Sequence, residues 1–289
     1  MGFGMDVTNV VTVFKKELAE VGKNLKKEFM RNKIVLIGAG NLGYHLGKRL
    51  YECKAGLYQI FSRTAKSAEA LSLETGNTPF VTDLNEIEKN ADLYIIAIKD
   101  DAIPEVAEKL HELGKKGNLI VHTSGVTPTN VFQPWFKRYG SFYPFQSFSK
   151  DQLPDFSRIP LCYFATKESD KAFLNKLGKK LGCKSYEIND LERAVLHVNG
   201  VFVNNFTNHL YQISWEIMKR ENLSFDLLRP LILETALKVM ENAPAEMQTG
   251  PAIRNDQQSI QRHIEYLKKF PEYKNVYEVL SKGIEGTRS

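Results

Sequence analysis

The clearest indication of the fold of this 289-residue chain is the segment Lys33-Ile34-Val35-Leu36-Ile37-Gly38-Ala39-Gly40-Asn41-Leu42-Gly43. Its first five residues form a short apolar run rich in β-branched side chains, which is typical of a buried parallel strand. Three glycines with the spacing G-x-G-x-x-G follow directly, and a helical pattern comes next. In this context Gly38 permits a tight turn, Gly40 lets the backbone approach a pyrophosphate, and Gly43 allows the helix to pack closely on the strand. The alternative is a glycine-rich turn without a ligand.

An arginine follows the second predicted strand, residues 58–61, within the sequence Ser62-Arg63-Thr64. Enzymes that use NAD commonly carry Asp or Glu at this place, where the carboxylate accepts hydrogen bonds from the ribose hydroxyls. A guanidinium is instead suited to grip a 2′-phosphate through forked, charge-assisted hydrogen bonds. The sequence therefore favours NADP(H) over NAD(H). The alternative is that Arg63 is merely exposed to solvent.

Apolar runs at residues 93–98 and 119–121 predict further buried strands, and residues 141–143, 161–165 and 184–188 are predicted to complete the sheet. The first of them ends at Lys99-Asp100-Asp101-Ala102-Ile103, and loops at the carboxyl ends of parallel strands form the ligand crevice of doubly wound folds. Helix capping is the alternative role for the two aspartates. The predicted cofactor-binding residues are Gly38, Gly40, Asn41, Leu42, Gly43, Ser62, Arg63, Thr64, Ile98, Lys99, Asp100 and Ile103.

The run at residues 119–121 delivers His122-Thr123-Ser124-Gly125 to the same sheet edge. Histidine titrates near neutral pH, so His122 is a candidate to exchange the proton that accompanies hydride transfer, with Ser124 beside it. The alternative is a structural histidine that orients the turn. The aromatic and amide loop at residues 144–148 is predicted to cover a pocket.

From Asp190 the apolar period changes to about 3.6, which predicts a helix of about thirty residues. Its polar residues include His197 and Asn205 within a cluster of asparagines and histidines, and asparagine is a poor helix former. This cluster predicts a group that hydrogen-bonds a substrate, and a packing network is the alternative. Further on, Arg254 stands before a helix start and is a candidate clamp for an anionic substrate group, or a partner of Asp256.

The composition of the chain argues against several other classes of protein. A net charge of +5 spread along the sequence suits a phosphate-bearing small molecule and gives no support for nucleic acid. No apolar run is long enough to span a membrane. Three scattered cysteines predict neither a disulfide framework nor a metal site, and they favour a cytoplasmic location. Residues 1–30 are predicted to form a peripheral helical extension, or to be an over-extended start of the chain.

The first half of the chain resembles the Rossmann domain of the 6-phosphogluconate dehydrogenase-like, ketopantoate reductase and pyrroline-5-carboxylate reductase families. Four stretches, at residues 122–125, 144–148, 197–205 and 250–256, resemble more specifically the bacterial proteins that join a Rossmann-like domain to domain of unknown function 2520. Those proteins are described as NADP oxidoreductases, coenzyme F420-dependent. The wider superfamily places a lysine four residues before an asparagine on this helix. If Asn205 matches that asparagine, Val201 occupies the lysine position and cannot supply a proton.

The prediction is an α/β protein, a doubly wound Rossmann sheet followed by an all-α domain. The predicted divisions are residues 1–30, 31–188 and 189–289, with a family boundary near 150 as an alternative. The predicted function is hydride transfer between NADP(H) and a small, anionic carbonyl or imine substrate, in a cytoplasmic homodimer. The candidate catalytic residues are His122, Ser124, His197, Asn205 and Arg254. The alternatives are a non-catalytic NADP(H) sensor or scaffold, and hydride exchange with a deazaflavin.

Overall fold

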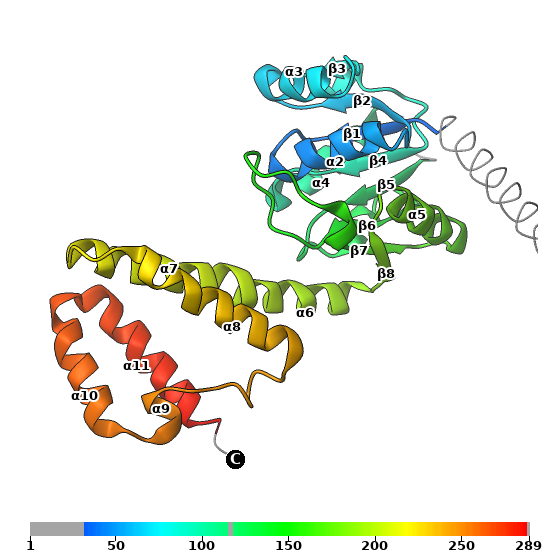
Figure 1. Ribbon diagram of the computed structural model, residues 1–289. Helices are drawn as coiled ribbons and strands as arrows, with labels where there is room; N and C mark the ends of the chain where they lie inside the picture. Colours follow the sequence, from blue (N-terminus) through cyan, green and yellow to red (C-terminus); the bar gives the residue numbers. More distant parts are fainter. Residues whose placement is uncertain (1–31, 115–117, 288–289) are drawn as a thin grey trace, which may run out of the picture. The chain divides into compact units, whose positions relative to one another are not determined.

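The structure is a computed structural model that describes residues 32–114 and 118–287 (Figure 1). The helical extension predicted for residues 1–30 lies outside the described residues. The chain divides into two compact units, and the division falls between Asn199 and Gly200. The predicted domain boundaries remain predictions, and each unit is described by itself.

The first unit is built on one eight-stranded sheet with the strand order β3-β2-β1-β4-β5-β6-β7-β8. Its strands are β1 (Ile34–Ile37), β2 (Leu57–Phe61), β3 (Phe80–Val81), β4 (Leu93–Ile96), β5 (Leu119–His122), β6 (Tyr139–Pro144), β7 (Pro160–Ala165) and β8 (Lys184–Glu187). Strands β3 to β6 pair in parallel, which confirms the predicted Rossmann-type sheet. The last two strands differ, because β7 runs antiparallel to β6 and β8 is parallel to β7. Between β6 and β7 lies only the short helix η4 (Phe156–Arg158), so no helical crossover returns the chain to a parallel strand.

The fully buried strand β1 divides its side chains between two hydrophobic cores, because successive residues of a strand point to opposite faces. Ile34 and Leu36 join the core that includes side chains of α2 (Asn41–Glu52), α3 (Ala65–Glu74) and α5 (Glu168–Lys180). Val35 and Ile37 join the opposite core with α4 (Ile103–Glu112) and η3 (Thr129–Phe132). Helices therefore cover both faces of the sheet, so a ligand-binding site is expected at the ends of the strands (Figure 1).

The long helix predicted from Asp190 changes its winding along its length. It runs as α6 (Asp190–Gly200), then as the π-helical segment η5 (Val201–Phe206), and then as α7 (Thr207–Arg220). Asn204 and Asn205 lie in the π-helical segment. Asparagine is a poor former of α-helix, and short π-helical segments occur frequently at functional sites.

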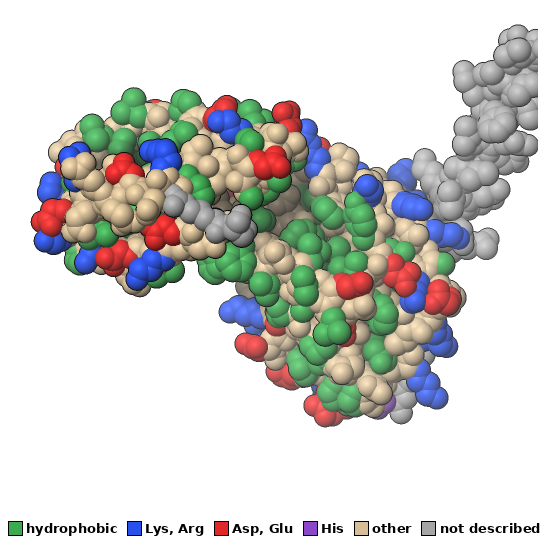
Figure 2. Space-filling view, turned by 90° about the horizontal axis from the view of Figure 1, so that it is seen from below, with side chains coloured by type: hydrophobic (Ala, Val, Ile, Leu, Met, Phe, Trp, Pro, Cys, Tyr) green, Lys and Arg blue, Asp and Glu red, His purple; other side chains and the backbone are tan. Residues whose placement is uncertain are grey.

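The second unit is helical and contains, after α7, the helices α8 (Arg229–Glu241), α9 (Pro251–Arg254), α10 (Gln257–Tyr266) and α11 (Pro271–Glu285). Its buried side chains include Ala252, Ile260, Leu267 and Phe270, whereas α8 has no buried residue. Hydrophobic side chains are exposed on this unit (Figure 2). Within the described ranges, no helix has the length and apolar character that crossing a membrane requires.

Candidate functional site

The turn between β1 and α2 is shaped by two contacts that only glycine permits. Gly38 has a φ of +113°, and a Cβ atom there would lie 2.1 Å from the carbonyl oxygen of Ala97. A Cβ atom on Gly43 would lie 2.2 Å from the carbonyl oxygen of Gly38. Gly40 differs from both, because a Cβ atom there would meet nothing within 4 Å. Gly38 and Gly43 therefore build the turn, whereas Gly40 leaves open space in front of it.

That open space belongs to a cavity of about 600 Å³ at the carboxyl ends of the parallel strands. Ser124, Lys150, Gly38, Gly40, Asn41, Leu42, Ser62, Arg63, Thr64, Ile98, Lys99 and Asp100 are among its lining residues. Two predicted cofactor residues lie elsewhere. Gly43 packs beneath the turn, and Ile103 is buried in the core under α4. The loop at residues 144–148, predicted to cover a pocket, is not among the residues that line this cavity, whereas Lys150, two residues beyond it, is.

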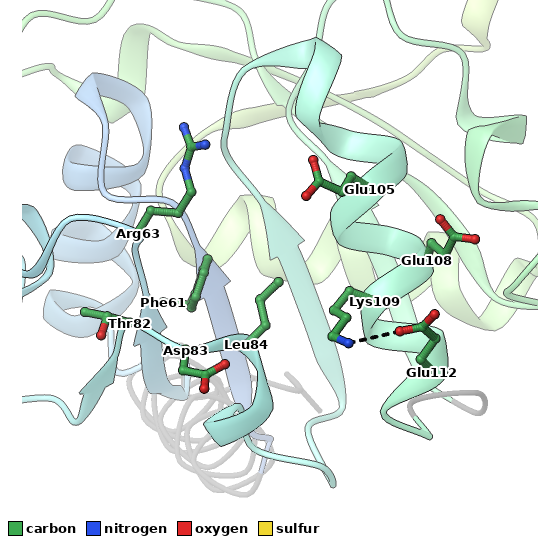
Figure 3. A pocket seen from close by; sticks show the side chains of 9 residues that line it. All are labelled: Phe61, Arg63, Thr82, Asp83, Leu84, Glu105, Glu108, Lys109 and Glu112. Carbon is green, nitrogen blue, oxygen red and sulfur yellow. Dashed lines mark hydrogen bonds and ion pairs between the residues drawn. The ribbon is translucent and has the colours of Figure 1, made fainter.

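Arg63 carries the positive charge at the end of β2. Its side chain is exposed and has no hydrogen-bond or ion-pair partner in the described part of the chain. It also lines an adjoining cavity of about 520 Å³, whose lining includes Phe61 and Leu84, with Glu105 of α4 on the opposite side from Arg63 (Figure 3). Because Arg63 has no partner among the described residues, its charge is available to a ligand.

His122 is completely buried, so the structure favours its structural interpretation. Its Nδ1 accepts a hydrogen bond from the backbone N–H of Ser124 at 3.2 Å, and its Nε2 has no partner among the described residues. Burial, and secondarily the charge of Arg193, lowers the pKa of His122 to about 3. The imidazole is therefore neutral at physiological pH and holds the turn after β5.

The sequence analysis missed Arg193, a fully buried guanidinium on α6. It donates hydrogen bonds to Asp190 Oδ1 (2.8 Å), to Ser141 Oγ (3.0 Å) and to the carbonyl of Thr127. The other carboxylate oxygen of Asp190 accepts from the backbone N–H of Thr129 at 2.8 Å. This network fixes the loop after β5 against the start of α6. The only local signal for it was an Asp and an Arg three residues apart.

Ser124 lies at the cavity with its hydroxyl oxygen already engaged. That oxygen accepts hydrogen bonds from the backbone N–H groups of Val126 (3.2 Å) and Thr127 (2.9 Å). Since both bonds use the oxygen as acceptor, the hydroxyl proton is free to be donated.

His197 lies in the first unit and contacts Tyr143, a residue that was not among the sequence-based candidates. Its Nδ1 is 3.2 Å from the hydroxyl oxygen of Tyr143 at the end of β6. Asn205 and Arg254 belong to the second unit, where both are exposed. Their catalytic roles remain predictions. The described residues contain no group of three potential metal ligands among His, Cys, Asp and Glu.

A Rossmann-type sheet with a glycine turn before a helix, and an unpaired arginine after β2, defines a dinucleotide-binding protein. Residues 33–125 match the family described as NADP oxidoreductase coenzyme F420-dependent, and residues 159–284 match domain of unknown function DUF2520. A solved structure from Bacteroides fragilis, provisionally described as an NADP oxidoreductase, is 41% identical, with a TM-score of 0.84 over 89% of this chain and 99% of that one. The chain belongs to this family of NADP oxidoreductases with a DUF2520 domain, and NADP(H) is the cofactor of the family.

More distant structures share the fold. A Thermotoga maritima protein is 21% identical, with a TM-score of 0.65 over 88% of this chain and 97% of that one. Pyrroline carboxylate reductase from Plasmodium falciparum, solved with NADP bound, is 12% identical, with a TM-score of 0.57 over 89% and 99% of the two chains. No curated protein sequence matches this chain. The comparisons confirm the predicted family.

The different surroundings of Gly40 and Gly43 yield a paired prediction. We expect Gly40→Val to keep the thermal midpoint of the wild type, because its side chain enters open space at an ordinary φ of −72°. The valine side chain would obstruct the backbone amides, so NADPH affinity should fall at least about tenfold, a loss of about 1.4 kcal/mol of binding free energy.

The Gly43→Ala variant should instead lower the thermal midpoint, because its Cβ atom would clash with the carbonyl of Gly38. Thermal unfolding and NADPH fluorescence titration measure the two effects. Equal NADPH affinity of Gly40→Val and the wild type would contradict the assigned role of the turn.

The neutral state of His122 predicts a pH dependence of stability. Its folded pKa of about 3 lies below the usual value of 6.5, so the unfolded chain binds the extra proton as pH falls between these values. Stability should therefore be full above pH 6.5 and decline toward pH 3, by at most about 1.4 kcal/mol per pH unit. Urea unfolding at several pH values measures it. In His122→Asn, the plot of unfolding free energy against pH should be less steep between pH 3 and 6.5, by an amount that corresponds to at most one proton. An unchanged slope would contradict the assigned neutral state of His122.

Proposed function

We propose that this protein binds NADP(H) along the cavity of the first unit and transfers a hydride between the nicotinamide and a small carbonyl or imine substrate. The main support for this proposal is that one cavity is lined by the open turn at Gly40, by the unpaired Arg63 and by Ser124 with its free hydroxyl proton. A phosphate-bearing cofactor and a proton-accepting substrate need these three kinds of group.

The residues present fit the cofactor. The backbone amides at the start of α2, from Gly40 to Leu42, would hold the pyrophosphate at the positive end of the helix. Ser62, Arg63 and Thr64 would hold the adenosine phosphate, and the apolar floor of Phe61 and Leu84 suits the adenine ring. Lys150, on the loop after β6, brings a further positive charge to the cavity. Its ammonium group lies 5.3 Å from the centre of the Tyr44 ring.

When bound, the reduced nicotinamide supplies the hydride, and the substrate atom that loses its double bond takes up a proton. The Ser124 hydroxyl is placed to donate a hydrogen bond to that atom, because its oxygen already accepts two backbone N–H groups. Asn205 would orient the substrate, and Arg254 would bind an anionic group on it. Both assignments rest on the sequence pattern and the family resemblance.

We also propose a homodimer that acts in the cytoplasm. Exposed apolar side chains on the second unit, among them Leu231, Leu233 and Leu237 on α8, offer a surface for a second copy. The free thiols of Cys53, Cys162 and Cys183 fit a reducing compartment. A monomeric mass at micromolar concentration in light scattering would argue against the dimer.

The rival proposal is an NADP(H) sensor without turnover, and the burial of His122 favours it because one candidate proton donor is removed. A panel of cyclic imines, oxo acids and a deazaflavin, each tested for NADPH oxidation by absorbance, separates the proposals. We expect at least one imine or oxo acid to oxidise NADPH catalytically. Turnover with the deazaflavin alone would assign the hydride acceptor to that class. Tight NADPH binding without turnover across the panel would favour the sensor.

Arg63 provides the test of cofactor choice. We expect Arg63→Ala to weaken NADPH binding about tenfold to a hundredfold, because the 2′-phosphate loses its charged hydrogen bonds and remains near Glu105. NADH affinity should stay near its wild-type value. Lys66→Ala is the matched control, since Lys66 is an exposed basic residue of α3 that does not line either cavity. Equal loss of NADPH and NADH affinity in Arg63→Ala would contradict the role in phosphate recognition.

A further inference from the structure

Two polar side chains from distant parts of the sequence converge on Gly125. The Tyr143 hydroxyl comes from the end of β6 and the His197 imidazole from α6, and their facing atoms are 3.2 Å apart. A Cβ atom on Gly125 would lie 2.3 Å from His197 Nδ1 and 2.9 Å from the Tyr143 hydroxyl oxygen. Only glycine therefore leaves room for this Tyr143–His197 pair.

The pair lies beside the part of the cavity that is lined by the ends of β4 and β5. Gly125 directly follows Thr123 and Ser124, which line the cavity. Asp100, another lining residue, is close enough for its charge to raise the pKa of Tyr143. Arg63, by contrast, lines the cavity from the end of β2, at the other side of β1 in the sheet. The pair therefore lies on the side of the cavity away from the proposed adenosine phosphate.

The surroundings of Tyr143 keep its proton in place at neutral pH. Burial, followed by the charges of Cys162 and Asp100, raises the pKa of the phenol to about 12, and only Arg193 opposes this. His197 is half-buried, whereas Tyr143 is almost completely buried. A proton lost from the buried hydroxyl is thus most directly replaced through the histidine that contacts it.

We propose that the Tyr143 hydroxyl is the proton donor of the reduction and that His197 resupplies the proton. The inference rests on the proposed function and deepens it. As the substrate carbon accepts the hydride, the electron pair of its double bond moves to the oxygen or nitrogen, which takes the Tyr143 proton. The phenolate oxygen then takes the proton from His197 Nδ1 while Nε2 takes a proton from a hydronium ion of the solvent, so the imidazole stays neutral and its proton returns to Nδ1 by exchange with water. The proposal assigns to the resting state the His197 tautomer whose Nδ1–H donates to the Tyr143 oxygen 3.2 Å away, which leaves the hydroxyl proton free for the substrate.

A proton-donor role for Tyr143 accounts for the lack of two other expected proton donors, which a purely structural Tyr143–His197 pair does not. A buried histidine, His122, is neutral and cannot supply the proton, and Val201 occupies the place of a lysine donor suggested by the family resemblance. The Tyr143–His197 pair brings a protonated hydroxyl and an imidazole beside the end of the cavity that Thr123 and Ser124 line. Ser124 then serves to orient the substrate atom while Tyr143 protonates it.

The test compares Tyr143→Phe with the matched control Tyr139→Phe, which removes a hydroxyl from the other end of the same strand. Each variant is titrated with NADPH by fluorescence and assayed with whichever cyclic imine or oxo acid the wild type reduces fastest. We expect Tyr143→Phe to keep wild-type NADPH affinity and to lower kcat by about 10²-fold to 10⁴-fold, the usual contribution of a general acid. Tyr139→Phe should keep both values. A wild-type kcat in Tyr143→Phe would overturn the proposal.

Side-chain nitrogen NMR of the histidines gives a readout that needs neither cofactor nor turnover. In the wild type, His197 should hold its proton on Nδ1, and in Tyr143→Phe the proton should shift toward Nε2. Identical His197 signals in the two proteins would overturn the hydrogen-bonded pair. Gly125→Ala should produce the same shift, because its Cβ atom displaces the pair while both functional groups remain.

The outcomes separate this inference from the proposed function. Absence of NADPH binding by the wild type, or a wild type that reduces no probe, contradicts the proposed function and with it the proton-donor role. Normal binding and turnover in the wild type, with an unaffected Tyr143→Phe variant, contradicts only the inference. A lower kcat together with the His197 shift supports both.

Discussion

The contact between the backbone of Gly38 and the carbonyl of Ala97 is the constraint on which the site depends. It brings the turn after β1 against the end of the neighbouring strand β4, at a distance that leaves no room for a side chain. Gly43 then allows α2 to start directly over that turn. The start of α2 consequently opens onto the cavity, and every proposal about the cofactor follows from this placement.

The two sides of the cavity are built on different electrostatic principles. On the β2 side Arg63 is exposed and has no partner among the described residues, so a phosphate group can neutralise its charge. On the β5 side the charge of Arg193 is buried, and its two terminal nitrogens donate hydrogen bonds to Asp190, Ser141 and the loop after β5. The first side is prepared for an anion. The second side is a rigid frame that presents neutral hydrogen-bonding groups, and neutral donors suit a substrate that must receive a proton.

Much of the fold and the cofactor half of the site could be predicted because their signals are local. The glycine spacing, the apolar runs and the arginine after the second strand each lie within about ten residues of sequence. The chemical half could not be predicted in the same way. Tyr143 and His197 are 54 residues apart, and Arg193 and Ser141 are 52 apart, so no short pattern reveals that they meet. The burial that makes His122 neutral is likewise invisible in the motif around it.

The Rossmann-type sheet, the glycine turn and the preference for a phosphorylated cofactor can be inferred from the sequence alone, because each depends on backbone geometry or charge that a few adjacent residues specify. The antiparallel direction of β7, the place of Ile103 in the core and the polar groups available at the cavity become known only from the folded chain. Burial and pairing arise from contacts between elements distant in sequence, and these contacts set the protonation state and accessibility of each side chain.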